Sequence, residues 1–384
     1  METPDSADWT VLTQGAHFSA RRHGRYLVAE LLGPHLALST SLIGGGQSDS
    51  VRFLLNHQSC EGAGHREAME ELHAMGRAAH HDHICRAAGL DPARTALMGT
   101  AANMQYAAVS EERFEDLAVV AIVTAGVQGN AGRAGDPAHW HENGENWRRI
   151  AATSGTINTL LLIGWPLLPP ALARAVVTMT EAKSAALDEL AVGSRASLGR
   201  ATGTGTDQFA AACPLDARRP LAHSGKHVKL GELIGRSVLA ATKEALRWQN
   251  GLEPSSTRSL THALGRFGLS EERLREGLAR RLPEAKNELA LKNWKSILYE
   301  PQVAACAYAM AEVADRARYG TLPAGATGEA LRHQAALLAA VLAARPAEFA
   351  AFSARLPSGH DLVELIIEAV ALGWAEKWPS RGQG

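Results

Sequence analysis

Residues 124–136 place polar side chains of four different kinds among four glycines, directly after an apolar run. The run, residues 119–123, is mostly β-branched and predicts a strand buried on both faces. The glycines permit sharp turns and a close approach of the backbone to a ligand. Because α/β sheets place their sites at the carboxyl ends of strands, the segment predicts a site, with a glycine-rich surface loop as the alternative. The hydroxyl, amide, guanidinium and carboxylate belong to Thr124, Asn130, Arg133 and Asp136.

A second polar loop, residues 201–207 with the sequence ATGTGTD, precedes an expected strand at 208–213. Its threonine hydroxyls can both donate and accept hydrogen bonds, and its glycines leave the backbone accessible. The loop ends in the carboxylate of Asp207, which is a candidate general base. The three hydroxyls belong to Thr202, Thr204 and Thr206.

His57 lies between the amides of Asn56 and Gln58, directly after an expected strand at 51–55. An isolated histidine is more often structural than catalytic, but this position at a strand end makes His57 a candidate base. A helix expected over 66–88 carries further histidines at spacings of three and four, which suit a metal ion. A solvated histidine-rich face is the alternative for this set, which comprises His73, His80, His81 and His83.

Lys183 lies in the apolar stripe of a helix expected over 171–191. A lysine at the core-facing edge of a helix is costly to bury unless it is paired. Its side chain therefore either extends to the surface or points into a cavity between helix and sheet. Glu181 lies two positions away and points elsewhere on the helix.

Positive charge gathers at the amino end of a helix expected over 230–248, although the helix dipole disfavours cations there. This arrangement predicts a nearby anion, such as Asp207, Asp136 or a ligand group, with an exposed loop as the alternative. The preceding segment HSGKHVK supplies His223, Lys226, His227 and Lys229.

The elements that must position these side chains predict an α/β (α+β) fold, in which a mixed β-sheet domain with packed helices is followed by a smaller all-α domain. Two strands are expected over 26–32 and 36–43, joined by a turn at Gly33-Pro34, and others over 95–102 and 159–163. The glycines of 44–46 give a weak phosphate-loop signal, with a flexible hairpin loop as the alternative. Residues 137–154 form a polar connector, either a lid or an ordinary loop.

The domain boundaries follow from a change of pattern near residue 250. We expect a first domain over 1–250, a linker over 251–257, and an all-α domain over 258–384 whose helices are separated by prolines. This second domain contains no motif that suggests chemistry, and we expect it to pack as a helical bundle.

Composition narrows the classes of protein and partner. The 384 residues carry a formal net charge of -1, which gives no electrostatic case for nucleic acid or an anionic membrane. The four cysteines lack CxxC spacing, which suits a reducing cytoplasm and argues against disulfides or a cysteine-built zinc site. The first residues show no signal-peptide pattern, and no apolar run is long enough to cross a bilayer.

Seven segments occurring in order resemble the adenosylcobinamide amidohydrolase (CbiZ) family over residues 26–249. They are NHQ at 56–58, ALMGTAAN at 96–103, VVAIVTAGVQGNAGRAGD at 119–136, GTINTLLLI at 155–163, TMTEAKSAALDEL at 178–190, ATGTGTDQ at 201–208 and HSGKHVKLGELIGRSV at 223–238. The resemblance implies a cytoplasmic corrinoid-salvage enzyme. Such enzymes hydrolyse the amide between the corrin propionyl group and aminopropanol, giving adenosylcobyric acid and (R)-1-amino-2-propanol from adenosylcobinamide. Some members also act on pseudocobalamin-type corrinoids, and the cobalt belongs to the substrate.

Amide hydrolysis requires a base, an oxyanion donor and an acid for the leaving amine. His57, Asp207 and Asp136 are candidate bases or their orienting partners, and Asn130 and Arg133 are candidate oxyanion donors. Lysines could protonate the amine or neutralise charge, namely Lys183, Lys226 and Lys229. Further candidate substrate-binding residues are Asn56, Thr124, Thr156, Asn158, Glu181, Thr204, Thr206 and His223.

Neither a GxSxG elbow nor an HExxH motif is present in the sequence. A threonine nucleophile within 202–206 therefore stays open, as does a divalent metal held by His57, Asp136 and Asp207. No metal ligand is assigned from the sequence.

The alternative function is that of a corrinoid-binding protein without hydrolytic activity, in which the helical domain is an interaction module. Some family members are fused to an α-ribazole phosphatase domain, but residues 258–384 show no acidic cluster suited to Mg²⁺ and phosphate. We expect the helical domain to pack against the first domain or to mediate formation of a homo-oligomer.

Overall fold

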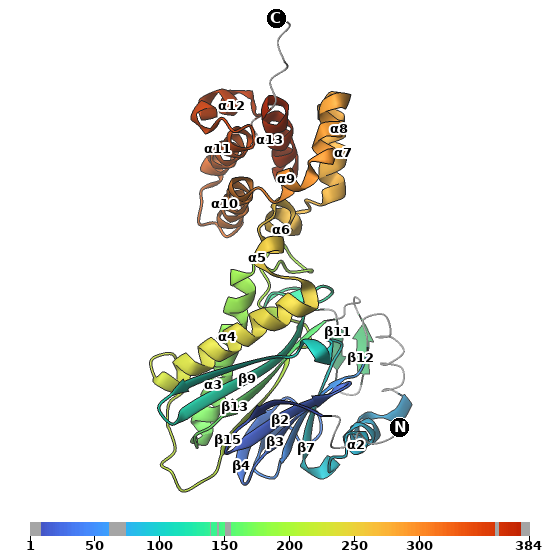
Figure 1. The fold of residues 1–384 in the computed structure, drawn as a ribbon, viewed down its shortest axis with the longest axis vertical. Coiled ribbons are helices and arrows are strands. Elements are labelled where there is room, and N and C mark those ends of the chain that lie inside the picture. Colours follow the sequence, from blue (N-terminus) through green and yellow to red (C-terminus); the bar gives the residue numbers. More distant parts are fainter. Residues whose placement is uncertain are drawn as a thin grey trace, which may run out of the picture. The chain divides into compact units, whose positions relative to one another are not determined.

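The computed structural model describes residues 9–60, 74–138, 140–143, 146–149, 155–357 and 361–377. The chain divides into two compact units, Met1–Leu252 and Glu253–Gly384. The first contains mixed β-sheets with packed helices and the second is helical (Figure 1). The predicted fold class is confirmed.

A six-stranded sheet forms the centre of the first unit, in the order β5-β4-β15-β13-β9-β8. Only the β13–β15 pair is parallel, and the other neighbours are antiparallel. The bounds are β4 His35–Ser39, β5 Gly46–Ser48, β8 Ala108–Phe114, β9 Leu117–Gly126, β13 Thr156–Ile163 and β15 Gln208–Pro214.

Alternate side chains of β9 enter two different cores, which confirms the prediction that this strand is buried on both faces. Val119, Ala121 and Val123 pack in the core shared with the helices. Val120 and Ile122 pack in the core shared with a second sheet.

The second sheet has five strands in the order β1-β2-β3-β6-β7. Its strands are β1 Thr10–Gln14, β2 Phe18–His23, β3 Tyr26–Leu31, β6 Phe53–Gln58 and β7 Thr95–Thr100. The strands expected over 26–32 and 36–43 exist as β3 and β4, but they belong to different sheets. The turn at Gly33 therefore carries the chain from one sheet to the other.

Helices cover the two outer faces of this sheet pair. α3 Pro169–Glu189 and α4 Lys229–Asn250 cover the six-stranded sheet (Figure 1). α2 Arg77–Ala87 packs on the five-stranded sheet through Ile84 and Cys85. The helix expected over 66–88 is described only in its second half, because residues 61–73, including His73, lie outside the described residues.

The polar connector expected over 137–154 is described only in part. β11 Trp140–Asn143 and β12 Asn146–Arg149 pair antiparallel within it. A lid role for this segment stays a prediction.

Helices of the second unit surround a single apolar core. Close approaches need glycine, because a Cβ on Gly277 would lie 2.5 Å from the Ile367 side chain and one on Gly373 would lie 2.5 Å from the Ala339 carbonyl oxygen. The helices are α5 Pro254–Thr257, α6 Leu260–Leu264, α7 Glu271–Arg281, α8 Glu284–Lys292, α9 Trp294–Leu298, α10 Pro301–Arg318, α11 Ala324–Leu342, α12 Phe349–Arg355 and α13 Leu362–Lys377.

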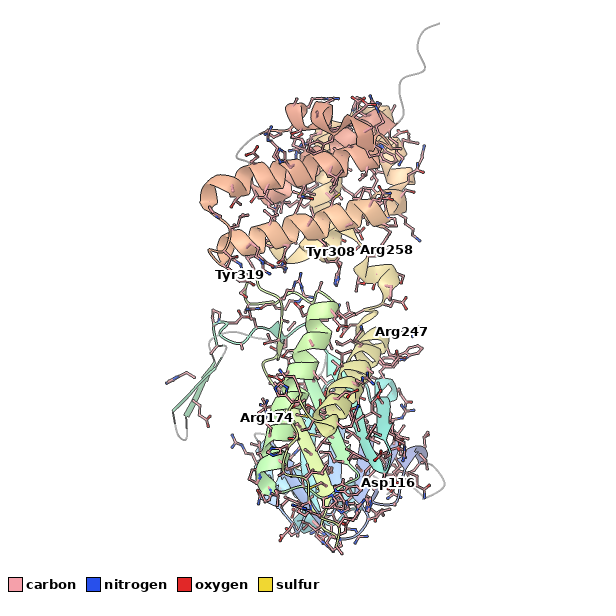
Figure 2. The ribbon with its side chains drawn as sticks, turned by 90° about the vertical axis from the view of Figure 1, so that its left-hand side faces the viewer. Asp116, Arg174, Arg247, Arg258, Tyr308 and Tyr319 are labelled. Carbon is pink, nitrogen blue, oxygen red and sulfur yellow. The ribbon has the colours of Figure 1, made fainter. Side chains whose placement is uncertain are left out.

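Polar contacts join the helices of this second unit. Tyr308 belongs to α10 (Figure 2). Its hydroxyl donates a hydrogen bond to the Thr257 carbonyl at the end of α5, at 2.6 Å. Arg266 and Asp315 form an ion pair in which each side chain is 4% exposed. α5 lies within the linker expected over 251–257. Across the described part of the chain, no helix is both long and apolar enough to span a bilayer.

Candidate active site

The two glycine-rich loops found in the sequence lie side by side. β10 Ala131–Gly132 pairs antiparallel with β14 Gly203–Thr204, so Ala131 faces Thr204 across this short ladder. The loops follow β9 and precede β15, which are separated in the sheet by β13. The site predicted after β9 therefore includes the loop that carries Asp207.

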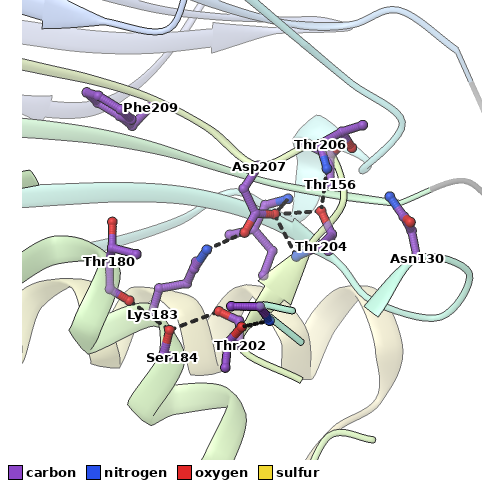
Figure 3. Close-up of polar contacts among 12 residues, drawn as sticks. Asn130, Thr156, Thr180, Lys183, Ser184, Thr202, Thr204, Thr206, Asp207 and Phe209 are labelled. Carbon is purple, nitrogen blue, oxygen red and sulfur yellow. Dashed lines mark hydrogen bonds and ion pairs between the residues drawn. The ribbon is translucent and has the colours of Figure 1, made fainter. Parts of the chain in front are cut away.

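Lys183 of α3 and Asp207 form an ion pair beneath these loops (Figure 3). The lysine and aspartate side chains are 13% and 18% exposed, so the pair is largely but not completely removed from water. Asp207 Oδ2 accepts from the Lys183 ammonium. Of the two alternatives for Lys183, the structure has the side chain directed toward the sheet rather than extended into solvent.

The other carboxylate oxygen of Asp207 is held by three donors. Oδ1 accepts from the backbone N–H groups of Ile157 and Thr204, both at 3.1 Å, and from the Thr204 hydroxyl at 2.5 Å. These bonds fix the plane of the carboxylate, because they come from the start of β13 and from the loop itself. The orientation of Lys183 follows from that of Asp207.

Gly203 is the residue that leaves room for this ion pair. A Cβ built on Gly203 would collide with Asp207 Oδ2 and would lie 2.6 Å from Lys183 Nζ. Ser184, next to Lys183, donates a hydrogen bond to the Thr202 carbonyl at 2.9 Å and ties α3 to the same loop (Figure 3).

A cluster of amide and hydroxyl groups lies next to the ion pair. Asn130 and Thr206 both donate to the Gly155 carbonyl, at 2.9 and 2.7 Å, and the hydroxyls of Thr156 and Thr206 are in contact. Gly155 adopts φ +144°, and a Cβ there would approach Asn130 to 3.0 Å. Asn130 and Thr156 are buried, whereas Thr206 is exposed.

Three predicted residues form a buried network between the two sheets. Asn158 of β13 donates to the Asn56 side-chain oxygen at 2.9 Å and to the Gly99 carbonyl at 3.0 Å. Asn56 of β6 in turn donates to the Thr124 hydroxyl of β9 at 2.9 Å. Within the described residues, Asn158 Oδ1 is buried without a hydrogen-bond partner.

His57 faces away from this network, because successive strand residues point to opposite faces of a sheet. Its ring stacks on Tyr26 at a centroid distance of 5.0 Å, and its Nδ1 lies 3.3 Å from the Ser59 hydroxyl. Burial, helped by His80, Arg25 and His83, lowers the pKa of His57 to about 3. The imidazole is therefore neutral at physiological pH, and it lies on the face covered by α2.

Asp136 and Arg133 stabilise the first glycine-rich loop. Asp136 accepts from the backbone N–H of Arg133 at 2.7 Å and from the Ser194 hydroxyl at 2.5 Å. Burial acts to raise the pKa of Asp136, but hydrogen bonds from Ser194, Ser197 and Arg133 hold it below its usual value. The Arg133 guanidinium donates to the Arg200 carbonyl at 3.3 Å. Asp136 thus has its own partners, separate from those of Asp207.

The cations predicted to lie near Asp207 or Asp136 pair with other acids. Lys226 pairs with Glu181 at 2.8 Å, and Lys229 pairs with Glu232 at 2.6 Å. Lys229 also lies 4.8 Å from the centre of the Phe114 ring, beside the turn where β9 begins. Thr124 is near the other end of β9, so Lys229 is far from the loops. His223 is exposed in the same segment as these lysines.

No three histidine, cysteine, aspartate or glutamate side chains are grouped for metal binding within the ranges that the structure describes. His57, Asp136 and Asp207, the set considered for a metal, lie in three different environments. Gly99, Ser184 and Gly203 contribute to the site but were not among the predicted site residues. Their position inside the motifs ALMGTAAN, TEAKS and ATGTGTD was the available signal.

A comparison with models of known protein families finds a match to this chain. A model described as adenosylcobinamide amidohydrolase (CbiZ) matches residues 10–254. An uncharacterised protein of Methanocaldococcus jannaschii is 35% identical over 174 residues, which is 43% of this chain and 68% of that protein. The match of the family model includes both glycine-rich loops, Lys183 and Asp207.

Proposed function

This chain belongs to the adenosylcobinamide amidohydrolase (CbiZ) family, and from that premise we propose that it hydrolyses the amide joining the corrin propionyl group to aminopropanol. Adenosylcobinamide and water give adenosylcobyric acid and (R)-1-amino-2-propanol, and pseudocobalamin-type corrinoids are further candidate substrates. We assign the reaction to residues 1–250. The helical region after the linker at 251–257 is proposed as an interaction module that supports self-association.

The observation that carries this proposal is the ion pair of Lys183 and Asp207 beneath two glycine-rich loops. Hydrolysis of an amide needs a proton acceptor for water and a donor for the oxyanion and the amine. A carboxylate and an ammonium held together, each with part of its surface open, supply both functions.

Asp207 is proposed to accept the proton of the attacking water. Its Oδ1 already accepts three hydrogen bonds, whereas Oδ2 accepts one, from Lys183. Oδ2 therefore keeps a lone pair for a water molecule. The water oxygen attacks the amide carbon while its proton passes to Oδ2.

Lys183 is proposed to stabilise the oxyanion of the tetrahedral intermediate. An ammonium has three N–H donors, and Asp207 uses one of them. When the C–N bond breaks, the departing amine takes the proton that Asp207 received. The carboxylic acid formed still carries the other proton of the water and passes it to the amine. The products are therefore a carboxylate and an ammonium, and Asp207 is again ionised.

The surrounding amides and hydroxyls suit the remaining parts of the substrate. A corrinoid carries carboxamides around its ring, and Asn130, Thr156 and Thr206 offer donors and acceptors beside the ion pair. We propose that these three side chains hold the substrate near the reacting amide. Asn56, Thr124 and Asn158 are proposed to hold the two sheets together, since they bond to one another and to the Gly99 carbonyl.

Thr204 is the threonine best placed to be a nucleophile, because its hydroxyl donates to Asp207 at 2.5 Å. A direct attack by water predicts that Thr204→Val lowers kcat by about tenfold through a less ordered carboxylate. A threonine nucleophile predicts that Thr204→Val abolishes turnover while Thr204→Ser keeps most of it. Measuring kcat for both variants separates the two mechanisms.

The reaction itself is tested by incubating the purified full-length protein with adenosylcobinamide, with and without EDTA, and resolving products by mass. Release of adenosylcobyric acid and aminopropanol in both arms supports the proposal as written. Product lost with EDTA and restored by one defined ion would assign the activation of water to a metal. Retention of intact adenosylcobinamide, without product, would favour the corrinoid-binding protein instead.

A further inference from the structure

The turn between β4 and β5 is a tightly built structure. The Ser41 hydroxyl donates to the Ile43 carbonyl at 2.6 Å and accepts from the Leu97 backbone N–H at 3.0 Å. A Cβ on Gly45 would collide with the Ser41 carbonyl oxygen, so only glycine fits there. The glycines of 44–46 therefore shape a fixed hairpin turn, and the conformation of residues 41–45 is determined.

This turn presents two apolar side chains to solvent. Leu42 is 73% exposed and Ile43 is 37% exposed, although Ser41 beside them is buried. Single exposed apolar residues are common on protein surfaces. Two consecutive ones on a turn fixed by side-chain hydrogen bonds and an obligatory glycine form a defined apolar step, which we call the Leu42–Ile43 step.

The step and Asp207 lie at the same end of two neighbouring antiparallel strands, β4 and β15. The Thr40 backbone N–H donates to the Phe209 carbonyl, and the Phe209 N–H donates to the Thr40 hydroxyl, both at 3.0 Å. Leu42 is two residues after Thr40, and Asp207 is two residues before Phe209. Two residues span at most ~7 Å, so the step lies within roughly 20 Å of the Asp207 carboxylate.

We propose that the Leu42–Ile43 step contacts the apolar face of the corrin ring when the scissile amide lies at Lys183 and Asp207. The inference rests on the proposed function, since the occupant is that substrate. A corrin is a broad ring with methyl groups on its rim, and its propionyl arm separates the ring from the amide. The ring must therefore lie beside the reacting groups rather than on them, and the bound of roughly 20 Å on the distance of the step allows the ring to reach it.

The size of the step favours a small-molecule occupant over a second copy of the chain. A stable protein interface buries roughly 800 Å² on each partner, and two side chains supply only a small part of that area. A macrocycle that touches the step with one face needs no larger apolar surface. Burial of the Leu42 and Ile43 side chains against the corrin ring contributes to the binding of both substrate and product, because both contain that ring.

The test uses adenosylcobyric acid, the expected product, so that binding is measured without turnover. Titration by absorbance gives its Kd for the full-length wild type and for the double variant Leu42→Ser/Ile43→Ser. We expect the Kd to rise by about tenfold and the KM for adenosylcobinamide to rise similarly. We expect kcat to stay within about twofold, because the step contacts no reacting atom.

Leu215→Ser is the matched control. Leu215 is 43% exposed and follows Pro214, the last residue of β15, at the end of that strand opposite Asp207. This variant removes an exposed leucine and is expected to leave Kd and KM unchanged.

An unchanged Kd in the double variant would overturn the inference while leaving the hydrolase intact, if wild type still forms product. A changed sedimentation mass with unchanged Kd would assign the step to a second copy of the chain and would also overturn it. If wild type binds adenosylcobyric acid but never hydrolyses adenosylcobinamide, the proposed function fails, and the tenfold effect on Kd still tests the step.

Discussion

Gly203 is the residue on which the geometry of the ion pair depends most directly. A methyl group at this position would collide with Asp207 Oδ2 and approach Lys183 Nζ to 2.6 Å. We predict that Gly203→Ala separates the pair and lowers kcat/KM by about 100-fold or more. The steady-state rate of adenosylcobyric acid formation measures this effect.

Gly235→Ala is the control for that substitution. Gly235 lies in α4, and a Cβ there would meet nothing within 4 Å. Alanine is favoured over glycine in a helix by about 1 kcal/mol, so this variant should be slightly more stable and fully active. Wild-type activity in Gly203→Ala would show that the pair tolerates displacement and would contradict the proposed geometry.

His57 makes stability depend on pH. Burial lowers its pKa from 6.5 to about 3, so between these values the unfolded chain binds a proton that the folded chain does not. The free energy of unfolding therefore falls as pH falls below about 6.5, by up to ~1.4 kcal/mol per pH unit. We predict that His57→Gln makes this slope shallower, as measured by urea unfolding between pH 7 and about pH 5.

His223→Gln serves as the reference, because His223 is exposed, and its slope should match that of wild type. Equal slopes in wild type and His57→Gln would show that His57 is not a buried neutral imidazole in solution. If His57→Gln lost more activity than the loss of folded protein explains, His57 would again be a candidate base.

Residue types alone made Lys183 and Asp207 candidate site residues, but they did not predict that the two side chains pair. Lys183 was conspicuous because an apolar stripe should not contain a lysine, and Asp207 because it ends a loop of hydroxyls and glycines. Their ion pair depends on how α3 packs over the loop before β15. Nothing in the spacing of residues 183 and 207 requires that contact, and the sequence named no partner for Lys183.

Strands from both sheets meet at the Asn56–Thr124–Asn158 network. Asn158 donates to Asn56 and to the Gly99 carbonyl, which fixes β13 against β6 and β7. We predict that Asn158→Leu leaves two buried acceptors unsatisfied and lowers the free energy of unfolding by about 2–4 kcal/mol. Urea unfolding followed by circular dichroism measures the change.

The hydroxyl of Thr242 in α4 is the appropriate comparison, since it is buried and has no hydrogen-bond partner among the described residues. Thr242→Val should therefore be neutral or slightly stabilising. If Asn158→Leu were as stable as Thr242→Val, the network would contribute nothing to holding the sheets together.

Sequence patterns identified the buried elements better than the exposed ones. β9, β13, α3 and α4 have long apolar or periodic runs, and each was predicted within a few residues. β1, β2 and β8 were not predicted, and stretches such as SARRH and SEERF carry consecutive charged residues in place of an apolar run. The assignment of β3 and β4 to different sheets depends on strands that come later in the sequence, β6 for β3 and β15 for β4.

Each of the two compact units has its own buried apolar residues. Among the residues that the structure describes, three cores belong to Met1–Leu252 and one belongs to Glu253–Gly384. In the second unit, Asp315 bonds Arg266 at 2.8 and 2.5 Å with both side chains buried. We predict that Asp315→Ala lowers the stability of this unit by about 3–5 kcal/mol, because it leaves a buried guanidinium without its carboxylate.

Scanning calorimetry of the full chain should resolve two transitions, and Asp315→Ala should lower only the one that belongs to the helical unit. Hydrolysis at 25 °C should stay within about twofold of wild type. Glu329→Ala, at an exposed position of the same unit, should change neither transition. A single transition that shifts as a whole, together with lost activity, would mean that the two units fold and function as one.

The most direct test of the account is the rate of adenosylcobinamide hydrolysis by Lys183→Met, Asp207→Asn and the double variant. If the two side chains act as one unit, each single substitution lowers kcat by about 1,000-fold, and the double variant is no slower than the slower single variant. A single variant that keeps kcat within about tenfold of wild type would contradict the assignment of hydrolysis to this ion pair.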